Sequence, residues 1–130
     1  MRIHGDRALL SGHGPLRADG SLAQPLGRVG AEVTLDEAYG AAGLTTLAML
    51  SSLKAALGDL DRMRYWLRVF GMVNAAPGFN RYPAVINGFS NGIVALYGAE
   101  QGAHARSAVG MARLPFGIAV EIEAEVAIDP

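Results

Sequence analysis

The sequence predicts an α+β fold in which two helices pack on one face of a mixed β-sheet. Three observations lead to this prediction. Segments with the hydrophobic period of strands or of helices follow one another in the order strand, helix, strand, helix, strand, strand. Gly88 and Gly92 lie inside the second helix, where each costs about 1 kcal/mol relative to alanine and so indicates close packing, which we expect to be onto the sheet. The central strand is apolar on both faces.

The first strand and the first helix have clear boundaries. Residues Ala8–Gly12 form a short apolar strand, and residues 13–30 form a loop punctuated by glycine and proline. Residues 34–37 read Thr-Leu-Asp-Glu, which is a capping box: the threonine accepts from the backbone three residues on, and the glutamate reaches back. We therefore expect a helix from this box to Leu57, closed by Gly58 at the C′ position.

The central strand is expected from Arg64 to Val73, and residues 74–78 break it. Strict alternation gives two faces that both carry large apolar side chains: Tyr65, Leu67, Val69 and Val73 on one, and Arg64, Trp66, Arg68, Phe70 and Met72 on the other. Two helices can cover only one face of a sheet. We therefore expect another subunit to cover the second face.

The second helix is expected to begin near Pro83, since proline suits the first helical position, and to end at Gly98. Two strands then complete the chain, joined by a turn at residues 114–117. In the last strand, apolar residues alternate with Glu121, Glu123 and Glu125.

The spacing of Arg106 and Glu121 depends on how the last two strands pair. If they pair antiparallel about the turn at residues 114–117, Glu121 lies opposite about residue 109. That position is three residues from Arg106, or about 10 Å along the strand. A carboxylate-bearing molecule of three or four carbons and a water molecule would fit in this gap.

Composition narrows the possible functions. The 130 residues predict a single domain, residues 1–130, and 51% of them are hydrophobic while 18% are charged, which favours a surface covered by another subunit. The net charge of −1 gives no attraction to nucleic acid or to a membrane surface. The absence of cysteine excludes disulfides and thiolate chemistry. Without a signal-peptide pattern or an apolar run near 18 residues, we expect a soluble cytoplasmic protein.

Arg106 and Glu121 are the residues whose chemistry is most suggestive. An arginine guanidinium binds a carboxylate through two parallel hydrogen bonds, which a lysine cannot reproduce. A glutamate can hold a water molecule and accept its proton, an effect worth about 10²–10⁴ in rate. Together they suit chemistry on a small molecule that carries a carboxylate.

Plainer interpretations also account for these residues. The three glutamates of the last strand are typical of a solvated sheet edge, and Arg106 alone is typical of a surface charge or of an ion-pair partner. His4, His13 and His104 have no metal-ligand spacing, so we predict no metal site, and no glycine-rich dinucleotide or phosphate loop is present. We therefore expect no cofactor.

Several segments together resemble one known family. They are Leu10-Ser11-Gly12, residues 57–61 and 69–73, and above all Ala105-Arg106-Ser107-Ala108-Val109 with Arg113-Leu114-Pro115 and Val120-Glu121-Ile122-Glu123-Ala124. On these residues the chain resembles the Rid (reactive intermediate deaminase) family, also called YjgF-type and endoribonuclease L-PSP. Residues 27–30 and 84–88 resemble its chorismate-mutase-like branch, a label that describes a shared fold.

The resemblance implies a homotrimer with a central β-barrel, helices outside, and ligand clefts between subunits. It implies that Arg106 grips a substrate carboxylate with help from the backbone amide of Ala108, and that Glu121 positions the hydrolytic water. Ser11, Gly12 and Asn87 match residues that line the family's cleft. The implied reaction is the hydrolysis of reactive enamines and imines, such as 2-imino acids, to 2-keto acids and ammonia.

The chain also departs from the family's pattern. Catalytic members carry an aromatic residue, usually tyrosine, ahead of the first strand, and this sequence begins at or after that point. The turn after Gly12 reads His-Gly-Pro, where Gln-Ile-Pro is commoner. An alternative function is therefore a non-catalytic trimer that binds a small carboxylate metabolite. A third, ribonuclease activity, rests on the family's label alone and disagrees with the balanced charge.

Overall fold

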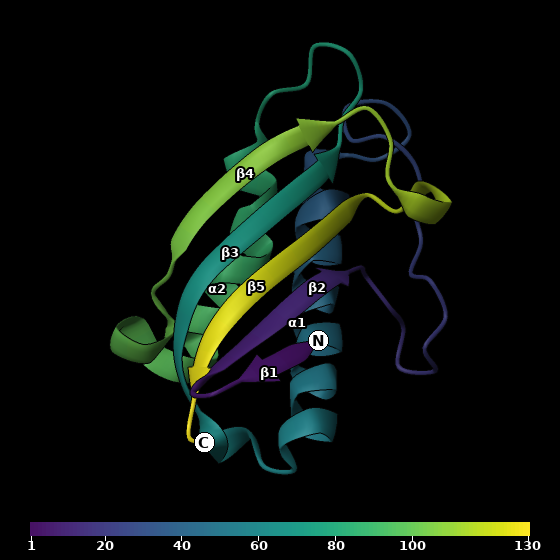
Figure 1. The fold of residues 1–130 in the computed structure, drawn as a ribbon. Coiled ribbons are helices and arrows are strands. Elements are labelled where there is room, and N and C mark those ends of the chain that lie inside the picture. Colours follow the sequence, from purple (N-terminus) through teal and green to yellow (C-terminus); the bar gives the residue numbers. More distant parts are fainter.

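The computed structural model describes residues 1–130 and confirms the predicted fold class. Two helices, α1 and α2, lie side by side on one face of a five-stranded sheet with the strand order β1-β2-β5-β3-β4 (Figure 1). The elements are β1 (Arg2–His4), β2 (Arg7–His13), α1 (Leu35–Leu57), β3 (Met63–Asn74), α2 (Tyr82–Gly102), β4 (Ala105–Met111) and β5 (Val120–Ile128), with short 3-10 turns η1 (Leu60–Arg62) and η2 (Pro115–Gly117).

The helix α1 begins and ends where the sequence predicts. Thr34 Oγ1 accepts from the backbone N–H of Glu37, and a Glu37 carboxylate oxygen accepts from the Thr34 N–H, so both halves of the capping box form. Gly58 follows the last turn with φ 81°, a conformation that glycine adopts at no steric cost. By length and mean hydropathy α1 would also pass for a membrane span, as core helices often do, and here eight of its residues are buried within the domain.

The pairing of the last two strands differs from the expectation. β4 lies parallel to β3 at the edge of the sheet, and β5 lies antiparallel to β3 on its other side, between β3 and β2. The antiparallel β4–β5 pair that the sequence suggested is therefore wrong. Because α2 carries the chain back across the sheet before β4 begins, β4 runs parallel to β3. The segment around η2 then crosses the end of β3 to start β5.

Two irregularities in β3 change which side chains face the core. The register against β5 shifts between Met63 and Tyr65 and again between Trp66 and Arg68. Such bulges place one extra residue in a strand and so reverse the alternation beyond it. Trp66, which strict alternation puts on the face opposite to Val69, is buried on the same side as Val69 and packs edge-on against Phe89.

The glycines of α2 serve the contact with α1. A Cβ atom at Gly88 would overlap the backbone carbonyl oxygen of Tyr39, and one at Gly92 would lie 3.5 Å from Thr46 Oγ1. The expected packing of these glycines onto the sheet is therefore wrong, since both face the neighbouring helix. Gly98 has φ 80° and interrupts α2, as predicted, although one further turn extends the helix to Gly102.

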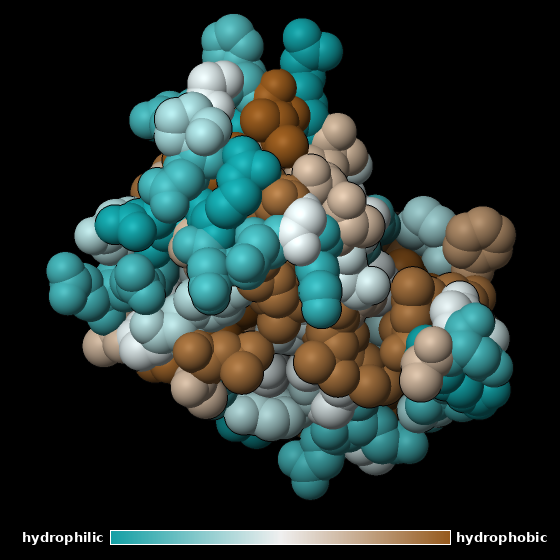
Figure 2. All heavy atoms as spheres, turned by 90° about the horizontal axis from the view of Figure 1, so that it is seen from below, coloured by the Kyte–Doolittle hydropathy of each residue, from teal (hydrophilic) through white to brown (hydrophobic).

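The face of the sheet away from the helices mixes apolar and charged groups. Leu9, Phe70 and Val109 share it with Arg7, Arg68 and the three glutamates of β5. Over the molecule as a whole, large exposed apolar side chains are spread over several elements, including Leu47, Leu96 and Phe116. Figure 2, which views the molecule from below, shows hydrophobic patches separated by hydrophilic side chains.

Candidate functional site

Arg106 is held by the helix beside its strand. It pairs in register with Val69, a core residue, and so lies on the helix-covered side of the sheet. Its Nη1 donates to Asn87 Oδ1 at 2.9 Å and to Ser90 Oγ at 3.1 Å, both on α2. The residue is half-buried, and these two hydrogen bonds fix the position of its side chain.

Ser90 and His104 extend this network, and neither was among the predicted site residues. His104 Nδ1 lies 2.7 Å from the carbonyl oxygen of Gly102, which can only accept, so Nδ1 carries the proton. Nε2 of the neutral ring is then an acceptor, and the Ser90 hydroxyl, 2.8 Å away, donates to it. Partial burial lowers the pKa of His104, and the nearby charge of Arg106 lowers it further, so the neutral form is favoured.

The network leaves one edge of the Arg106 guanidinium open. Both Nη1 hydrogens have acceptors, whereas Nε and Nη2 make no hydrogen bond within the protein. This edge is the one that presents two parallel N–H groups to a carboxylate. Arg106 is therefore anchored on one side and free to bind on the other.

Arg106, Ala108 and Gly110 form a row on the helix-covered side of β4. Ala108 packs against the core, and a Cβ atom at Gly110 would lie 2.5 Å from the ring of Tyr82, so the Tyr82 ring lies directly over this glycine. β4 is an edge strand, so alternate backbone N–H groups along it face away from the sheet. Such groups make no hydrogen bond within the sheet and can donate to another molecule.

Glu121 lies on the other face of the sheet, next to β2. A Cβ atom at Gly12 would overlap Glu121 Oε2, which shows that the carboxylate rests on the Gly12 backbone. Gly12 and Ser11 occupy the irregular part of β2, where the register against β5 shifts between Leu10 and His13. Glu121 is half-buried and makes no ion pair or side-chain hydrogen bond.

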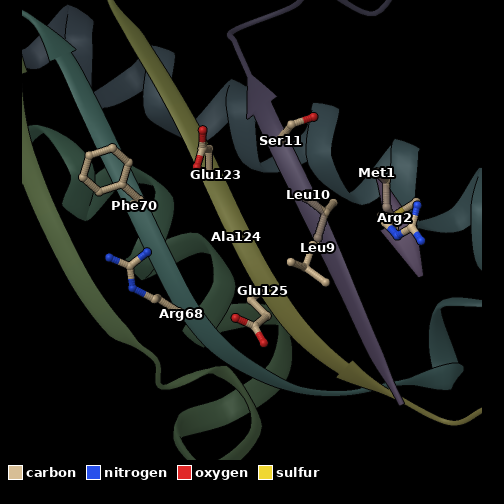
Figure 3. A pocket seen from close by; sticks show the side chains of 10 residues that line it. All are labelled: Met1, Arg2, Leu9, Leu10, Ser11, Arg68, Phe70, Glu123, Ala124 and Glu125. Carbon is tan, nitrogen blue, oxygen red and sulfur yellow. The ribbon is translucent and has the colours of Figure 1, made fainter. Parts of the chain in front are cut away.

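Ser11 also lines a groove of about 460 Å³ on this open face (Figure 3). Glu123 and Phe70 stand beside it, and the Arg68 guanidinium lies 5.8 Å from the centre of the Phe70 ring. Glu125 accepts from Arg7 at 2.6 Å, an exposed pair. The groove therefore contains charges of both signs.

The residues predicted for the site form two groups. Arg106, Ala108 and Asn87 come together on the helix-covered side of β4, and Ser11, Gly12 and Glu121 come together on the open face. Glu121 pairs with Met72, and Met72 pairs with Val109, so β3 separates the two strands. Within one chain Arg106 and Glu121 thus face opposite sides of the sheet, and the single gap of about 10 Å between them is wrong.

The chain is similar in sequence to a known protein family and to at least one named protein. Residues 1–120 match the family described as "YjgF/chorismate mutase-like, putative endoribonuclease". Protein TCP17 of Trypanosoma cruzi is 44% identical over 103 residues, which are 79% of this chain and 64% of that protein, so the chain spans less than two thirds of this relative's length.

Solved structures show the same architecture. The Agrobacterium tumefaciens protein Atu1372, of unknown function, is 43% identical with a TM-score of 0.94, covering 99% of this chain and 81% of that one. A "putative endoribonuclease" of Shewanella oneidensis is 28% identical with a TM-score of 0.91, covering 98% and 82%. RidA of a Psychrobacter bacterium is 20% identical with a TM-score of 0.63, covering 98% and 85%, which shows the fold alone.

Proposed function

Since the chain belongs to the YjgF/chorismate mutase-like family, we propose that it hydrolyses reactive 2-imino acids to 2-keto acids and ammonia. The observation that carries the proposal is the anchored guanidinium of Arg106, whose Nε–Nη2 edge is open. An enzyme that clears small imino acids must hold their common carboxylate, because little else distinguishes them. A guanidinium with a fixed orientation does this with good directionality.

The active site, in this proposal, forms between copies of the chain. Arg106 with Asn87 and the Ala108 amide supplies one half, and Glu121 with Ser11 and Gly12 supplies the other. The two halves lie on opposite faces of one sheet, so a single chain cannot bring them together. A homotrimer in which the β4 edge of one copy lies against the open face of the next would do so at three equivalent clefts.

The chemistry needs few groups. A protonated imine is already electrophilic, so the carboxylate needs only to be held while water attacks the C=N carbon. Glu121 accepts a proton from that water and returns it to the nitrogen of the tetrahedral adduct. The hydroxyl group of the adduct then loses its remaining proton to Glu121 as the C=O bond of the keto acid forms and the C–N bond breaks, and the departing ammonia takes up this proton and leaves as ammonium. Each proton is accounted for, and no cofactor is required.

The test measures ammonia release from enzymatically generated 2-iminobutanoate. We expect wild-type protein to accelerate it, and Arg106→Ala or Glu121→Gln to remove most of the acceleration, about 10²-fold or more. Glu123→Gln is the matched control for Glu121, because it removes a carboxylate from the same face of the same strand. Light scattering on each variant shows whether assembly is retained.

Co-expression of the two inactive variants tests the shared site directly. Arg106→Ala chains keep Glu121, and Glu121→Gln chains keep Arg106. In randomly mixed trimers one cleft in four receives both intact residues, so about one quarter of the wild-type rate should return. The double variant should stay inactive. No recovery in mixed assemblies would place both residues in one copy or outside the active site.

The alternative functions correspond to specific outcomes. Wild-type protein that assembles and binds 2-oxobutanoate without accelerating ammonia release would be a carboxylate-binding protein. Salt-dependent cleavage of RNA would instead support the activity in the family's description. We expect no such cleavage, because the net charge is −1 and the open face mixes both signs of charge.

A further inference from the structure

A single serine hydroxyl joins the ring of His104 to the guanidinium of Arg106. Ser90 Oγ lies 2.8 Å from His104 Nε2 and 3.1 Å from Arg106 Nη1. His104 stands just before β4 and Arg106 is the second residue of that strand, whereas Ser90 belongs to α2. The three side chains therefore meet where the helix lies along the edge strand. Any change in the charge of His104 takes place next to the guanidinium that is proposed to hold a carboxylate.

The hydrogen bonds of this cluster can be satisfied with His104 either neutral or protonated. In the neutral ring Nδ1–H donates to the Gly102 carbonyl oxygen, and Nε2 accepts from the Ser90 hydroxyl. In the protonated ring Nε2 becomes a donor, and Ser90 Oγ has a second lone pair that can accept from it while the first still accepts from Arg106. The freed hydroxyl hydrogen can turn to the carbonyl oxygen four residues earlier in the same helix. Protonation therefore requires only the rotation of one hydroxyl group.

No acidic side chain offsets the positive charge at this point of the molecule. Arg106 takes part in none of the ion pairs of the chain. Burial lowers the pKa of His104 below its ordinary value of 6.5, and Arg106 is the charged group that lowers it further. Of the other titratable groups on the adjoining elements, Tyr97 of α2 packs against the core, Glu100 of α2 is exposed, and Arg68 of β3 lies on the open face. A protonated His104 therefore lies beside a second positive charge with no counter-ion from the chain.

We propose that binding of a carboxylate at Arg106 is coupled to protonation of His104, so that the site takes up a carboxylate and a proton together. The proposal rests on the carboxylate-binding role that the proposed function gives to Arg106. A bound carboxylate offsets the charge of Arg106, which disfavours the protonated ring, and the protonated ring in turn attracts the carboxylate. Because both residues are half-buried, solvent screens this interaction less than it would at the surface. His104 is thus a positioning residue, which acts on the ligand through Arg106.

The coupling has a definite direction with pH. At pH values well above the histidine range the ring is neutral with or without a ligand, so affinity does not depend on it. As the pH falls, the ring takes up its proton in the complex before it does so in the free protein, and the affinity for a carboxylate rises until both forms are protonated. We expect this rise to be about three- to tenfold for two charges separated by one hydroxyl group. By reciprocity, a saturating carboxylate should raise the pKa of His104 by the logarithm of the same factor.

Titration with 2-oxobutanoate, followed by NMR on isotope-labelled protein at pH 7.5 and pH 5, tests this coupling. The ligand is a strong enough acid to stay ionised at both pH values. Shifts of the Ser107 and Ala108 amides report binding at Arg106, and the ring resonances of His104 report its protonation. We expect about three- to tenfold tighter binding at pH 5, and a His104 titration that moves to higher pH when the ligand is saturating.

His104→Gln separates the charge of the ring from its hydrogen bonds. A glutamine amide can donate to a carbonyl oxygen and accept from a hydroxyl, as the neutral ring does, but it cannot take up a proton. We expect this variant to bind 2-oxobutanoate as wild type does at pH 7.5, with no tightening at pH 5. His4→Gln is the matched control, because it removes an exposed histidine of β1 and should keep the full tightening.

The possible outcomes distinguish this proposal from the proposed function. Equal affinity of wild type at both pH values, an unchanged His104 titration in saturating ligand, or the same tightening in His104→Gln would overturn the coupling. Weaker binding by His104→Gln to the same extent at both pH values would show a purely structural role and would also overturn it. None of these outcomes bears on ammonia release. Coupled binding without ammonia release would overturn the proposed function alone, and absence of 2-oxobutanoate binding would overturn both.

Discussion

The two halves of the proposed active site differ in how completely one chain prepares them. Arg106 is fixed by Asn87 and Ser90, and Ser90 is fixed in turn by His104. Glu121 rests on a glycine and has no hydrogen-bond partner of its own. A single chain therefore fixes the guanidinium proposed to hold a ligand, whereas it leaves the proposed catalytic carboxylate without a hydrogen-bond partner, so that in the proposed mechanism only a ligand or a second copy would fix its position.

The largest effect we expect comes from disturbing the helix that anchors Arg106. In Gly88→Ala, the new methyl group would overlap the Tyr39 carbonyl oxygen, and backbone atoms cannot yield as a side chain can. We expect a loss of about 3 kcal/mol in unfolding free energy, or roughly 10 °C in Tm by calorimetry. Gly40→Ala, which has open space around it on α1, should be neutral or stabilising. Equal stability of the two variants would contradict this packing.

Gly12→Ala should remove activity while leaving the fold intact. Its methyl group would displace the Glu121 carboxylate, which is the flexible end of a side chain, so the cost in stability should stay below about 1 kcal/mol. Under the proposed mechanism kcat should fall about 10²-fold, as in Glu121→Gln, with the affinity for 2-oxobutanoate unchanged. A normal kcat would show that the position of Glu121 over Gly12 does not matter for the reaction.

His104 should make the stability of the folded chain sensitive to acid pH. Its pKa is lowered in the folded chain from the ordinary value of 6.5, chiefly by burial, so the unfolded chain takes up a proton first as the pH falls. Stability should therefore decrease as the pH drops below 6.5, and stop decreasing once the folded His104 is also protonated. Denaturant unfolding of wild type and His104→Gln at pH 7.5 and 5 measures this. A pH dependence that is unchanged in the variant would assign it to other groups.

Of these variants, Ser90→Ala should change the measured properties least. Arg106 would lose one of its two anchors and keep Asn87, so its guanidinium should be less well fixed. We expect KM for the imino acid to rise about three- to fivefold, with kcat nearly unchanged. A fall in kcat instead would indicate that the Ser90–His104 pair takes part in proton transfer.

Helix ends and strand positions that depend on neighbouring residues were predictable from the sequence. The arrangement of the candidate site was not, because it depends on which strands pair. The capping box at Thr34 and the glycine at 58 depend on neighbouring residues, so α1 was predictable to within a residue. The position of β4 depends on where α2 returns the chain, and the burial of Trp66 depends on two bulges that no alternation pattern reveals.

Ser90 and His104 escaped prediction for a similar reason. They meet only because α2 lies along β4, and neither stands in a recognisable motif. A signal was nevertheless present. Ser90 lies three residues after Asn87, on the same side of the helix, and His104 stands just before β4, two residues ahead of Arg106. If the polar residues on one side of a helix are matched with those on one side of the strand that follows it, the network of Asn87, Ser90, His104 and Arg106 is suggested.

The edge strand β4 has a consequence for the chain before it assembles. An exposed edge carries backbone groups that can recruit strands from other molecules indiscriminately, and charged side chains on such an edge discourage this. Arg106 is the one charged residue of β4. We therefore expect the residue proposed to bind substrate also to discourage newly made chains from aggregating through this edge. Its replacement by an apolar residue should lower the soluble yield of the protein as well as its activity.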